Sequence, residues 1–504
     1  MARSFKTVDL FAGPGGLAEG FSSLRDDQGR RVFDIALSVE KEASAFRTLR
    51  LRSFVRQFDR PPDAYYEYLQ EQITLATLCG LHPTEWAEAE QETVMLELGR
   101  PEAQVFLDPL LDQIREEASD RSVVIGGPPC QAYSLVGRAR NRGTPGYDPA
   151  EDTRHFLYRE YIRILGRLQP AAFVMENVKG ILSAKIDGIG VFQRVLEDLR
   201  HAGGTPESYV LLPLLATKSG IAANVIRCED FGIPQARHRV ILLGIRRDIM
   251  ERVPENVART ARLQPEPMQA DVASVLRGMP ELRSGLSRGD DSPEAWRQAV
   301  LAGYRKAASA CREDGTWLGE VVKKLGEHAR QLADVDTLAP RSSRELASAR
   351  DNRLNAWLAD ERLPVLTNHM ARTHMDSDLS RYAFVATFAE VFGRSPKADQ
   401  FPTGLAPDHR NWNTGKFADR FRAQCWGMPS TTVTSHISKD GHYFIHPDPL
   451  QCRSLTVREA ARLQTFPDNY HFEGNRTQQF VQVGNAVPPL LARQIAKIIQ
   501  HLIG

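Results

Sequence analysis

The sequence predicts an α/β protein whose main part is a doubly wound, mostly parallel sheet, joined to a second, smaller α+β domain. From residue 5 to about residue 250, short apolar runs alternate with longer helical patterns, as in repeated strand–helix units. The runs are continuously apolar, which is typical of parallel strands covered by helices on both faces. A glycine-rich segment follows the first run directly, where such folds turn from strand to helix.

The expected elements follow in chain order. We expect strands at residues 7–11, 34–39, 122–125, 171–175, 209–215 and 240–245. After about residue 250 the pattern changes to amphipathic helices, which we expect at 290–311, 317–334 and 343–359. Residues rich in Gly, Pro, Asn and aromatic side chains follow, with a strand-like stretch at 431–437. The last two helices are expected at 453–464 and 486–503, with the turn Val-Gly-Asn-Ala-Val-Pro-Pro between them.

Length and composition bound the possible classes of protein. Single hydrophobic cores stop growing at about 250–300 residues, so a chain of 504 residues predicts at least two packed units. The 42% apolar and 25% charged residues exclude a disordered chain, a coiled coil and a collagen-like repeat. The 64 basic and 63 acidic residues leave a net charge of +1, which by itself gives no sign of nucleic-acid binding.

Cysteine spacing and hydropathy predict a cytoplasmic protein with no metal and no membrane partner. The six cysteines form no Cys-x-x-Cys pair, so neither a disulfide scaffold nor a zinc site is expected. No apolar segment approaches the ~20 residues of a membrane span, and the N-terminus lacks the apolar core of a signal peptide.

The glycine-rich segment predicts a site for a nucleotide-like ligand. Gly13 and Gly15 open a G-x-G-x-x-A spacing, in which glycines let the backbone approach the ligand closely. Glu40 ends the second strand, where a carboxylate can accept both ribose hydroxyls, and Phe11 lies where an adenine can stack. A NAD-dependent oxidoreductase, an adenosyl-cofactor methyltransferase and a plain tight turn all fit this segment. Pro14 inside the loop argues against the dinucleotide.

Cys130 is the candidate nucleophile. It follows a strand and a rigid Gly-Gly-Pro-Pro turn, at the strand end where open α/β sheets place ligands. The two prolines restrict the backbone and thereby the direction of the thiol. The alternative is a buried structural cysteine, but the polar Pro-Pro-Cys-Gln setting favours a nucleophile, which must react as the thiolate.

Glu176 and two arginines form a second candidate cluster. Glu176 lies where the expected strand at 171–175 ends, which places a carboxylate at the same edge of the sheet. Arg237 and Arg239 alternate just before the strand at 240–245, so in an extended chain they share a face and can reach Glu176. Read singly, Glu176 is equally a helix cap and each arginine is equally a surface charge.

Taken together, these segments resemble the cytosine-carbon-5 DNA methyltransferase family. The resemblance covers residues 5–250 and 453–504, roughly three fifths of the chain. It rests on six segments in the family's order, namely residues 9–21, Gly-Pro-Pro-Cys-Gln at 127–131, Glu-Asn-Val at 176–178, Gln-x-Arg-x-Arg at 235–239, Arg-Glu-Ala-Ala-Arg-Leu-Gln at 458–464 with Phe-Pro after it, and Gln-Val-Gly-Asn-Ala-Val-Pro-Pro at 482–489.

The resemblance implies an S-adenosylmethionine-dependent fold of the Rossmann type and a covalent mechanism. Cys130 would attack carbon-6 of a cytosine flipped out of duplex DNA, and protonated Glu176 would bond ring N3. Arg239 would hold the cytosine O2 and orient Glu176, with Arg237 in support. The residues that fall where the family contacts S-adenosylmethionine are Phe11, Gly13, Gly15, Gly16, Leu17, Glu40, Pro128, Leu157, Asn485 and Val487.

The resemblance also implies the domain plan and the partners. Residues 1–250 form the first part of the catalytic domain, 251–452 a target-recognition domain with a helical insertion, and 453–504 a return segment. A monomer that acts on double-stranded DNA is expected, as the modification enzyme of a restriction–modification system with a cognate endonuclease. In the recognition region, basic and aromatic side chains mix at Arg410, Trp412, Lys416, Phe417, Arg420, Phe421, Arg422 and Trp426.

Several alternatives stay open at this point. The acidic residue that the family would place against the adenine amino group is not identifiable from the sequence; Glu97 and Asp108 are candidates, and neither is chosen. The insertions at about 50–120 and 256–400 have no assigned role. A tRNA cytosine-5 methyltransferase is the nearest rival, although the roughly 200-residue variable region favours DNA. NAD-linked oxidoreduction explains only the glycine loop, and a silent DNA-binding module leaves Cys130 and Glu176 without a role. The target sequence is not predicted.

Overall fold

The computed structural model describes residues 4–118, 120–129, 157–186, 189–216, 224–348, 353–407, 412 and 420–504. The described chain divides into two compact units. Unit 1 comprises residues 1–232, 237–268 and 486–504, and unit 2 comprises residues 233–236 and 269–485. These boundaries differ from the expected ones at 250 and 453, because residues 453–485 pack with unit 2 and only the last helix returns to unit 1.

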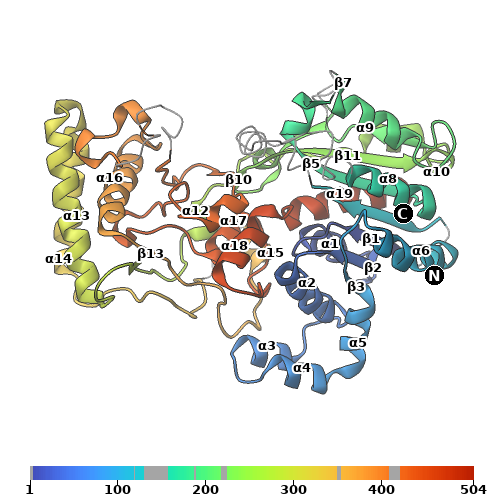
Figure 1. Ribbon diagram of the computed structural model, residues 1–504, viewed down its shortest axis with the longest axis horizontal. Helices are drawn as coiled ribbons and strands as arrows, with labels where there is room; N and C mark the ends of the chain where they lie inside the picture. The colour runs from blue at the N-terminus through green and yellow to red at the C-terminus, as the bar shows by residue number, and fades with distance from the viewer. Residues whose placement is uncertain are drawn as a thin grey trace. The chain divides into compact units, whose positions relative to one another are not determined.

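Unit 1 is built on an eight-stranded, mostly parallel sheet in the described residues (Figure 1). Its main path runs in the order β3-β2-β1-β4-β5-β11-β8, with β9 paired to β11. β11 is antiparallel to β5, β8 and β9, whereas the pairs among β1 to β5 are parallel. The strands are β1 (Phe5–Leu10), β2 (Phe33–Glu40), β3 (Thr93–Met95), β4 (Ser122–Gly126), β5 (Ala172–Val178), β8 (Tyr209–Leu212), β9 (Val225–Arg227) and β11 (His238–Arg246).

The strand order reverses between β1 and β4. From β1 the chain proceeds outward through β2 to β3, and then returns to β4 on the other side of β1. In doubly wound sheets such a switch point opens a crevice at the carboxyl ends of the strands, where ligands bind. The predicted fold class and all six predicted strands of this unit are confirmed, with ends that shift by up to three residues.

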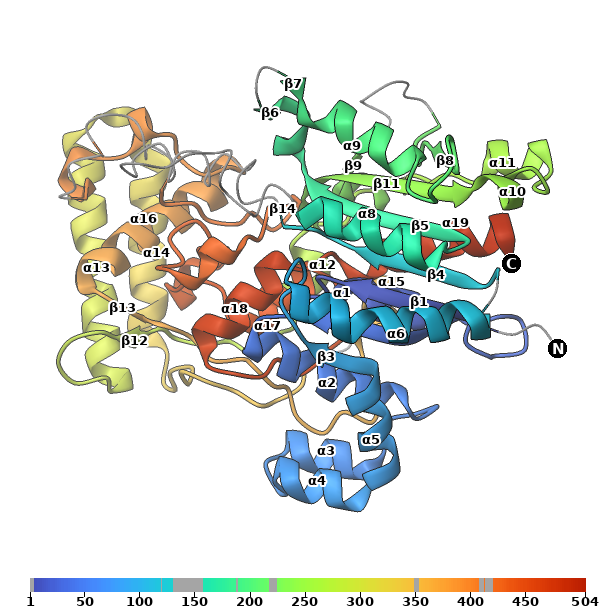
Figure 2. The ribbon, with the colours of Figure 1, turned by 45° about the vertical axis from the view of Figure 1, so that its right-hand side comes forward.

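Helices cover both faces of the sheet (Figure 2). α1 packs against α19, and α6 packs against α8, whose Tyr161 hydroxyl donates to the carbonyl of Val174 on β5 at 2.9 Å. The larger helices are α1 (Gly16–Ser22), α2 (Ala43–Arg56), α6 (Pro101–Ala118), α8 (Leu157–Leu168), α9 (Val191–Arg200) and α19 (Pro489–Ile503), with short α10 (Arg247–Met250) and α11 (Glu255–Thr260).

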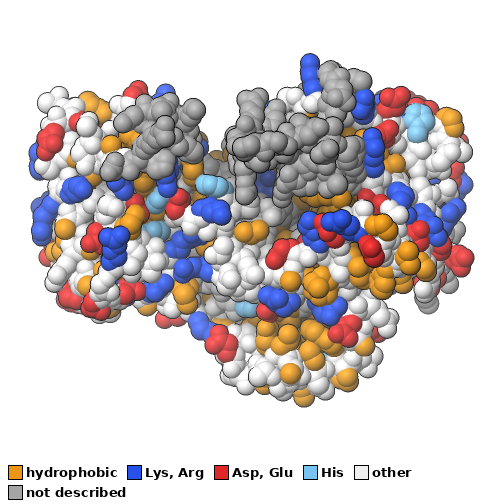
Figure 3. All heavy atoms as spheres, in the orientation of Figure 1, with side chains coloured by type: hydrophobic (Ala, Val, Ile, Leu, Met, Phe, Trp, Pro, Cys, Tyr) orange, Lys and Arg blue, Asp and Glu red, His pale blue; other side chains and the backbone are white. Residues whose placement is uncertain are grey.

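A small helical lobe is inserted between β2 and β3. After α2, the chain forms α3 (Asp63–Leu69), α4 (Leu75–Leu81) and α5 (Pro83–Glu92), which project from the rest of unit 1 in Figures 1 and 2. Hydrophobic side chains reach the surface of this lobe (Figure 3), and Leu81 is 57% exposed. The lobe accounts for much of the insertion expected at about 50–120.

Unit 2 is mainly helical, with short parallel two-stranded ladders. Ser292 is the N-cap of α13, and its side chain accepts the Ala295 N–H. The helix packs against α14 and α16 around a core that includes Trp296, Tyr304 and Phe384. The helices are α12 (Ala273–Leu276), α13 (Pro293–Glu313), α14 (Gly319–Asp334), α15 (Arg353–Leu358), α16 (Asp376–Phe392), α17 (Val457–Leu463) and α18 (Arg476–Asn485). The ladders pair β10 (Gln235–Ala236) with β14 (Ser430–Thr431) and β12 (Gly285–Leu286) with β13 (Thr373–His374).

Three predictions for unit 2 are wrong. Within the described part of the helix expected at 343–359, residues 343–348 are not helical and α15 alone forms, because the backbone of Ser343 and Arg344 bonds residues 366–369 instead. The strand expected at 431–437 is limited to β14, since Thr432 Oγ1 donates to the Ala236 carbonyl and a 3₁₀ turn follows at Ser435–Ser438. The expected Val-Gly-Asn-Ala-Val-Pro-Pro turn begins inside α18, a helix that was not predicted.

Buried histidines give unit 2 a predictable pH dependence. Burial lowers the pKa of His369 to about 4, with Nε2 donating to the Pro280 carbonyl at 3.1 Å and Nδ1 facing Thr456 Oγ1 at 3.0 Å. Between pH 6.5 and 4 the unfolded chain therefore binds the proton that the folded chain rejects, so stability present above pH 6.5 is lost as the pH falls. The loss amounts to at most about 3 kcal/mol for this histidine.

We therefore expect His369→Gln to flatten the decline in unfolding free energy between pH 7 and pH 4.5. Urea unfolding followed by tryptophan fluorescence measures it, because five of the six tryptophans belong to unit 2. His501→Gln on α19 is the control, since His501 is exposed. An unchanged slope in His369→Gln would contradict the expectation.

Candidate active site

The predicted site residues of unit 1 gather at the carboxyl edge of the sheet. The registers pair Leu10 with both Val39 and Gly126, and Gly126 with Met175, so the ends of β1, β2, β4 and β5 lie side by side. Phe11, Glu40, Gly127 and Glu176 stand at or just after these ends. The switch point thus carries the glycine loop and the acid of the second cluster together.

The glycine loop has the backbone that its sequence predicts. Gly13 and Gly15 adopt φ values of 57° and 93°, and Phe11 also has a positive φ of 55°. A Cβ on Gly13 would meet nothing within 4 Å, whereas a Cβ on Gly16 would collide with the carbonyl oxygen of Val487. Gly13 therefore faces open space suited to a ligand, and Gly16 permits the close packing of α1 on the start of α19.

The Glu40 carboxylate fixes the backbone of the glycine loop through hydrogen bonds. Its Oε2 accepts the Gly13 N–H at 2.8 Å, and its Oε1 accepts the N–H groups of Lys41 and Glu42 at 2.9 and 2.7 Å. A carboxylate offers about four acceptor positions, so three backbone bonds leave about one for a ribose hydroxyl. The sequence predicted a ribose ligand but not the structural role in shaping the loop.

Glu176 and Arg239 form an ion pair. Arg239 Nε lies 2.8 Å from Glu176 Oε1, and each side chain is only 12% exposed. Arg239 Nη1 also donates to the His238 carbonyl at 2.8 Å, which fixes the guanidinium. Gly127 lies against the same carboxylate, since a Cβ there would be 3.0 Å from Glu176 Oε2. The structure thus brings Glu176 and Arg239 together as the alternating arginine pattern predicted.

Arg237 lies deeper in the same cluster. It is 1% exposed, and burial together with the nearby charge of Arg239 lowers its pKa to about 9, against the opposing charge of Glu176. Cys228 is fully buried beside these charges, and burial raises the pKa of its thiol to about 12. A thiol held neutral in this way is a packing group, which distinguishes Cys228 from a candidate nucleophile.

Asn177 is a positioning residue to which sequence reasoning gave no role. Its side-chain amide donates to the Pro128 carbonyl at 3.3 Å, and its Oδ1 accepts the Val178 N–H at 2.9 Å. It thereby ties β5 to the Gly-Pro-Pro turn that leads to Cys130. In the sequence, Asn177 is only a polar residue next to Glu176, and nothing there indicates its bond to Pro128. Cys130 itself lies outside the described residues.

Comparison with known proteins identifies the family. Residues 105–501, more than three quarters of the chain, match the family model described as C-5 cytosine-specific DNA methylase. This chain belongs to that family. It is 35% identical to the Type II methyltransferase M.Bpa9945I of Bacillus paralicheniformis over 98% of each chain. It is also 26% identical to the DNA (cytosine-5-)-methyltransferase M.ApeKI of Aeropyrum pernix over 99% of each chain.

The family membership confirms the predicted enzyme class, a DNA (cytosine-5-)-methyltransferase. A crystal structure assigned to a DNA modification methyltransferase of an Escherichia coli prophage matches with a TM-score of 0.54 at 18% identity, covering 99% of each chain. That likeness supports the fold. The C-5 cytosine-specific DNA methylase family implies S-adenosylmethionine as the methyl donor.

The other residues predicted to contact the cofactor lie in different places. Leu157 begins α8, with its Cδ2 3.1 Å from where a Cβ of Gly99 would stand, in the loop after β3. Leu17 is 6% exposed within α1. Val487 belongs to unit 1, and its carbonyl oxygen packs against Gly16, whereas Asn485 ends α18 in unit 2.

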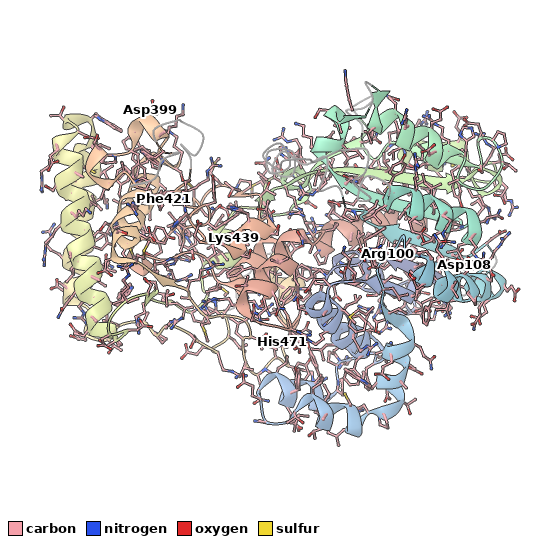
Figure 4. All side chains as sticks on the ribbon, viewed as in Figure 1. Arg100, Asp108, Asp399, Phe421, Lys439 and His471 are labelled. Atoms are coloured by element: carbon pink, nitrogen blue, oxygen red, sulfur yellow. The ribbon has the colours of Figure 1, made fainter. Side chains whose placement is uncertain are left out.

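The structure separates the two acidic candidates for the adenine amino group (Figure 4 labels Arg100 and Asp108). Glu97 follows β3 at the carboxyl edge and bonds Lys41 and Arg100 at 3.3 and 3.2 Å, which lowers its pKa. Asp108 lies on α6 and pairs with Arg163 of α8 at 2.7 Å. Of the two, Glu97 follows the strand whose Met95 pairs with Glu40, at the edge of the sheet that carries the glycine loop.

The remaining observations concern metals and membranes. Among the residues that the structure describes, no group of three or more His, Cys, Asp or Glu side chains is arranged to hold a metal ion. Within the same ranges, no helix has the length and apolar character needed to cross a lipid bilayer.

Proposed function

We propose that this enzyme methylates carbon-5 of a cytosine flipped out of double-stranded DNA, through a covalent adduct with Cys130, as the modification enzyme of a Type II restriction–modification system. The observation that carries the proposal is the Glu176–Arg239 ion pair beside the Gly127–Pro128 turn. Two groups suited to a cytosine ring thus lie next to the segment that ends in Cys130. The proposal includes a monomeric enzyme and a cognate endonuclease.

The chemistry follows from the low nucleophilicity of cytosine carbon-5. The Cys130 thiolate adds to carbon-6, so a carbon–sulfur bond forms and the carbon-5–carbon-6 double bond opens, while protonated Glu176 passes its proton to N3 and so draws charge from the ring. Arg239 donates to the cytosine O2 and holds Glu176 in place. When bound, S-adenosylmethionine would supply an electrophilic methyl group for carbon-5, with cleavage of its methyl–sulfur bond and the thioether as leaving group. A base then takes the carbon-5 proton, N3 returns its proton to Glu176, the carbon-5–carbon-6 double bond re-forms, and Cys130 leaves as the thiolate.

The glycine loop fits the proposed cofactor. Gly13 leaves open space beside a loop whose backbone is already set by Glu40, and Phe11 stands at the end of β1 next to it. Phe11, Gly13, Gly15, Gly16, Leu17, Glu40, Pro128, Leu157, Asn485 and Val487 are the residues that we propose to hold S-adenosylmethionine. The acceptor position left on Glu40 suits one ribose hydroxyl.

Glu40→Gln is expected to raise the Kd for S-adenosylmethionine by about 10- to 100-fold. The amide lacks the charge and presents only one acceptor oxygen, so the ribose loses a charge-assisted bond worth about 1.5–3 kcal/mol, which corresponds to this change in Kd. Calorimetric titration measures the Kd, with Glu88→Gln on the exposed side of α5 as the control. A change below threefold would argue against the ribose contact.

The function is tested with tritiated S-adenosylmethionine on duplex DNA, single-stranded DNA and tRNA, followed by mapping of the methylated cytosines. Label on carbon-5 of duplex cytosines supports the proposal. Label on tRNA alone would favour the rival substrate, to which no feature of the described structure points. Label on adenine would contradict both the DNA and the tRNA cytosine-5 methyltransferase.

The covalent step is tested separately with duplexes that carry 5-fluorocytosine. Fluorine replaces the proton that must leave, so the adduct persists and can be seen by denaturing electrophoresis. Cys130→Ser is expected to give no adduct, whereas Cys79→Ser, a half-buried cysteine on α4, keeps it. An adduct in the Cys130→Ser variant would show that another residue is the nucleophile.

A further inference from the structure

Unit 2 contains a groove whose lining is positively charged. It has a volume of about 450 Å³ and lies between residues 393–398, directly after α16, and residues 422–431. Figure 4 labels Asp399 and Phe421, which adjoin these two segments in the chain. Arg394, Lys397 and Arg422 line the groove, and none of its described lining residues is Asp or Glu. Such a surface attracts a polyanion.

The walls of the groove are held together. Ser395 Oγ donates to the Ala423 carbonyl at 2.9 Å, which joins one wall to the other. Arg394 Nη1 donates to Gln400 Oε1 at 2.7 Å, and its guanidinium carbon lies 5.5 Å from the centre of the Phe388 ring. Arg394 is therefore oriented in advance, so that contact with a phosphate costs little side-chain entropy.

The opposite wall offers an apolar contact. Met428 is 54% exposed, although its backbone is fixed by the Val272 N–H, which donates to the Met428 carbonyl at 2.9 Å. A large apolar side chain on a fixed backbone, beside cations, fits a duplex, because an apolar group can touch a thymine methyl while cations meet phosphates.

The groove borders β14, which pairs with the short strand β10. Thr431 lines it and belongs to β14, which pairs Ser430 with Gln235 and Thr431 with Ala236. Buried Gln424 accepts the Thr431 N–H at 2.9 Å and fixes that strand. Arg237 is the next residue of the chain after Ala236, so the strand that β14 pairs with directly precedes the proposed catalytic arginines in the sequence.

We propose that this groove reads duplex DNA beside the target cytosine, with Arg394 and Lys397 on phosphates and Met428 against a base edge. The inference rests on the proposed function, because it assigns the contacts of the same substrate. Of the basic and aromatic residues expected in the recognition region, it uses Arg422. Arg420 bonds Asp440 at 2.9 Å, Phe421 is buried in the core, and Arg410, Lys416 and Phe417 lie outside the described residues.

The test measures DNA affinity and sequence preference in separate arms. Binding of a fluorescent duplex that carries the mapped target, and of a scrambled duplex, is followed by anisotropy between 50 and 200 mM salt. Arg394→Gln and Lys397→Gln are each expected to weaken binding of both duplexes and to reduce the slope of log K against log salt by about 0.9. Lys323→Gln on α14, also exposed, is the matched control and keeps the slope.

Met428→Ala is expected to leave the salt slope unchanged and to lower, about fivefold or more, the preference in kcat/KM for the target over singly substituted sites. If Arg394→Gln and Lys397→Gln had the same salt slope as Lys323→Gln, the proposed phosphate contacts would be wrong. If Met428→Ala kept the wild-type preference for the target sequence, the proposed Met428 contact would be wrong. In both cases wild-type methylation of the duplex would leave the proposed function standing. Wild-type enzyme that methylates no duplex would instead overturn the proposed function.

Discussion

Glu176→Gln is expected to lower kcat for cytosine methylation by about 10²–10⁴-fold, the range over which a positioned general acid contributes. The amide matches the carboxyl group in size but cannot pass a proton to N3 as Cys130 adds to carbon-6. It also removes the partner that holds Arg239 Nε at 2.8 Å. Both losses act on the adduct-forming step, so the 5-fluorocytosine adduct should form more slowly by a similar factor.

Single-turnover kinetics with labelled S-adenosylmethionine measures this effect, because product release then does not mask the chemical step. The KM for S-adenosylmethionine should stay within about threefold, since Glu40 rather than Glu176 lies at the glycine loop. Asp108→Asn removes another arginine-paired carboxylate of unit 1 and should leave kcat unchanged. A Glu176→Gln variant within tenfold of wild type would exclude Glu176 as the acid.

The features of unit 1 that the sequence predicted are those that depend on local pattern. Continuously apolar runs identify strands covered on both faces, and parallel strands end at one edge, so Glu40 and Glu176 were placed at that edge correctly. The alternation of Arg237 and Arg239 likewise predicted a shared direction, and the Glu176–Arg239 ion pair agrees with it. Such inferences need only the period of the side chains and the sheet topology.

The features that the sequence did not predict depend on partners distant in the chain. Asn177 bonds Pro128, which lies 49 residues earlier in the chain, and Glu40 bonds Gly13, which lies 27 residues earlier. No local sequence pattern predicts either bond. The expected helix at 343–359 fails for the same reason, because the backbone of Arg344 bonds Leu366. Helical periodicity measures a local preference, and tertiary pairing of the backbone can override it.

The core of unit 2 contains an ion pair with a large predicted effect on stability. Arg453 and Glu459 are both fully buried, with Nη1 and Nη2 of the arginine each 2.7 Å from an oxygen of the carboxylate. Burial alone would raise the pKa of Glu459, but the Arg453 guanidinium beside it outweighs burial and holds that pKa far below its usual range. Glu459 Oε2 also accepts the Thr456 N–H at the start of α17.

Glu459→Gln should therefore cost about 3–5 kcal/mol of unfolding free energy, because it leaves the Arg453 charge buried without its counter-charge. The double variant Arg453→Met/Glu459→Leu should be much closer to wild type, since apolar groups can replace a buried pair. Glu327→Gln, which breaks the exposed Lys324–Glu327 pair on α14, should leave the unfolding free energy nearly unchanged, because water screens that pair. Urea unfolding followed by tryptophan fluorescence measures all three variants.

The consequence for function follows from what α17 supports. Gln464, at its end, accepts from Gln235 Nε2 at 3.2 Å, and Gln235 Oε1 accepts the Val433 N–H at 2.8 Å. Loss of the ion pair should thus loosen β10, the strand just before Arg237, and lower kcat even under conditions in which the protein stays folded. If Glu459→Gln were as stable as wild type, the predicted effect of the ion pair on stability would be wrong. If the variant were less stable but fully active when folded, α17 would not be the support of this strand.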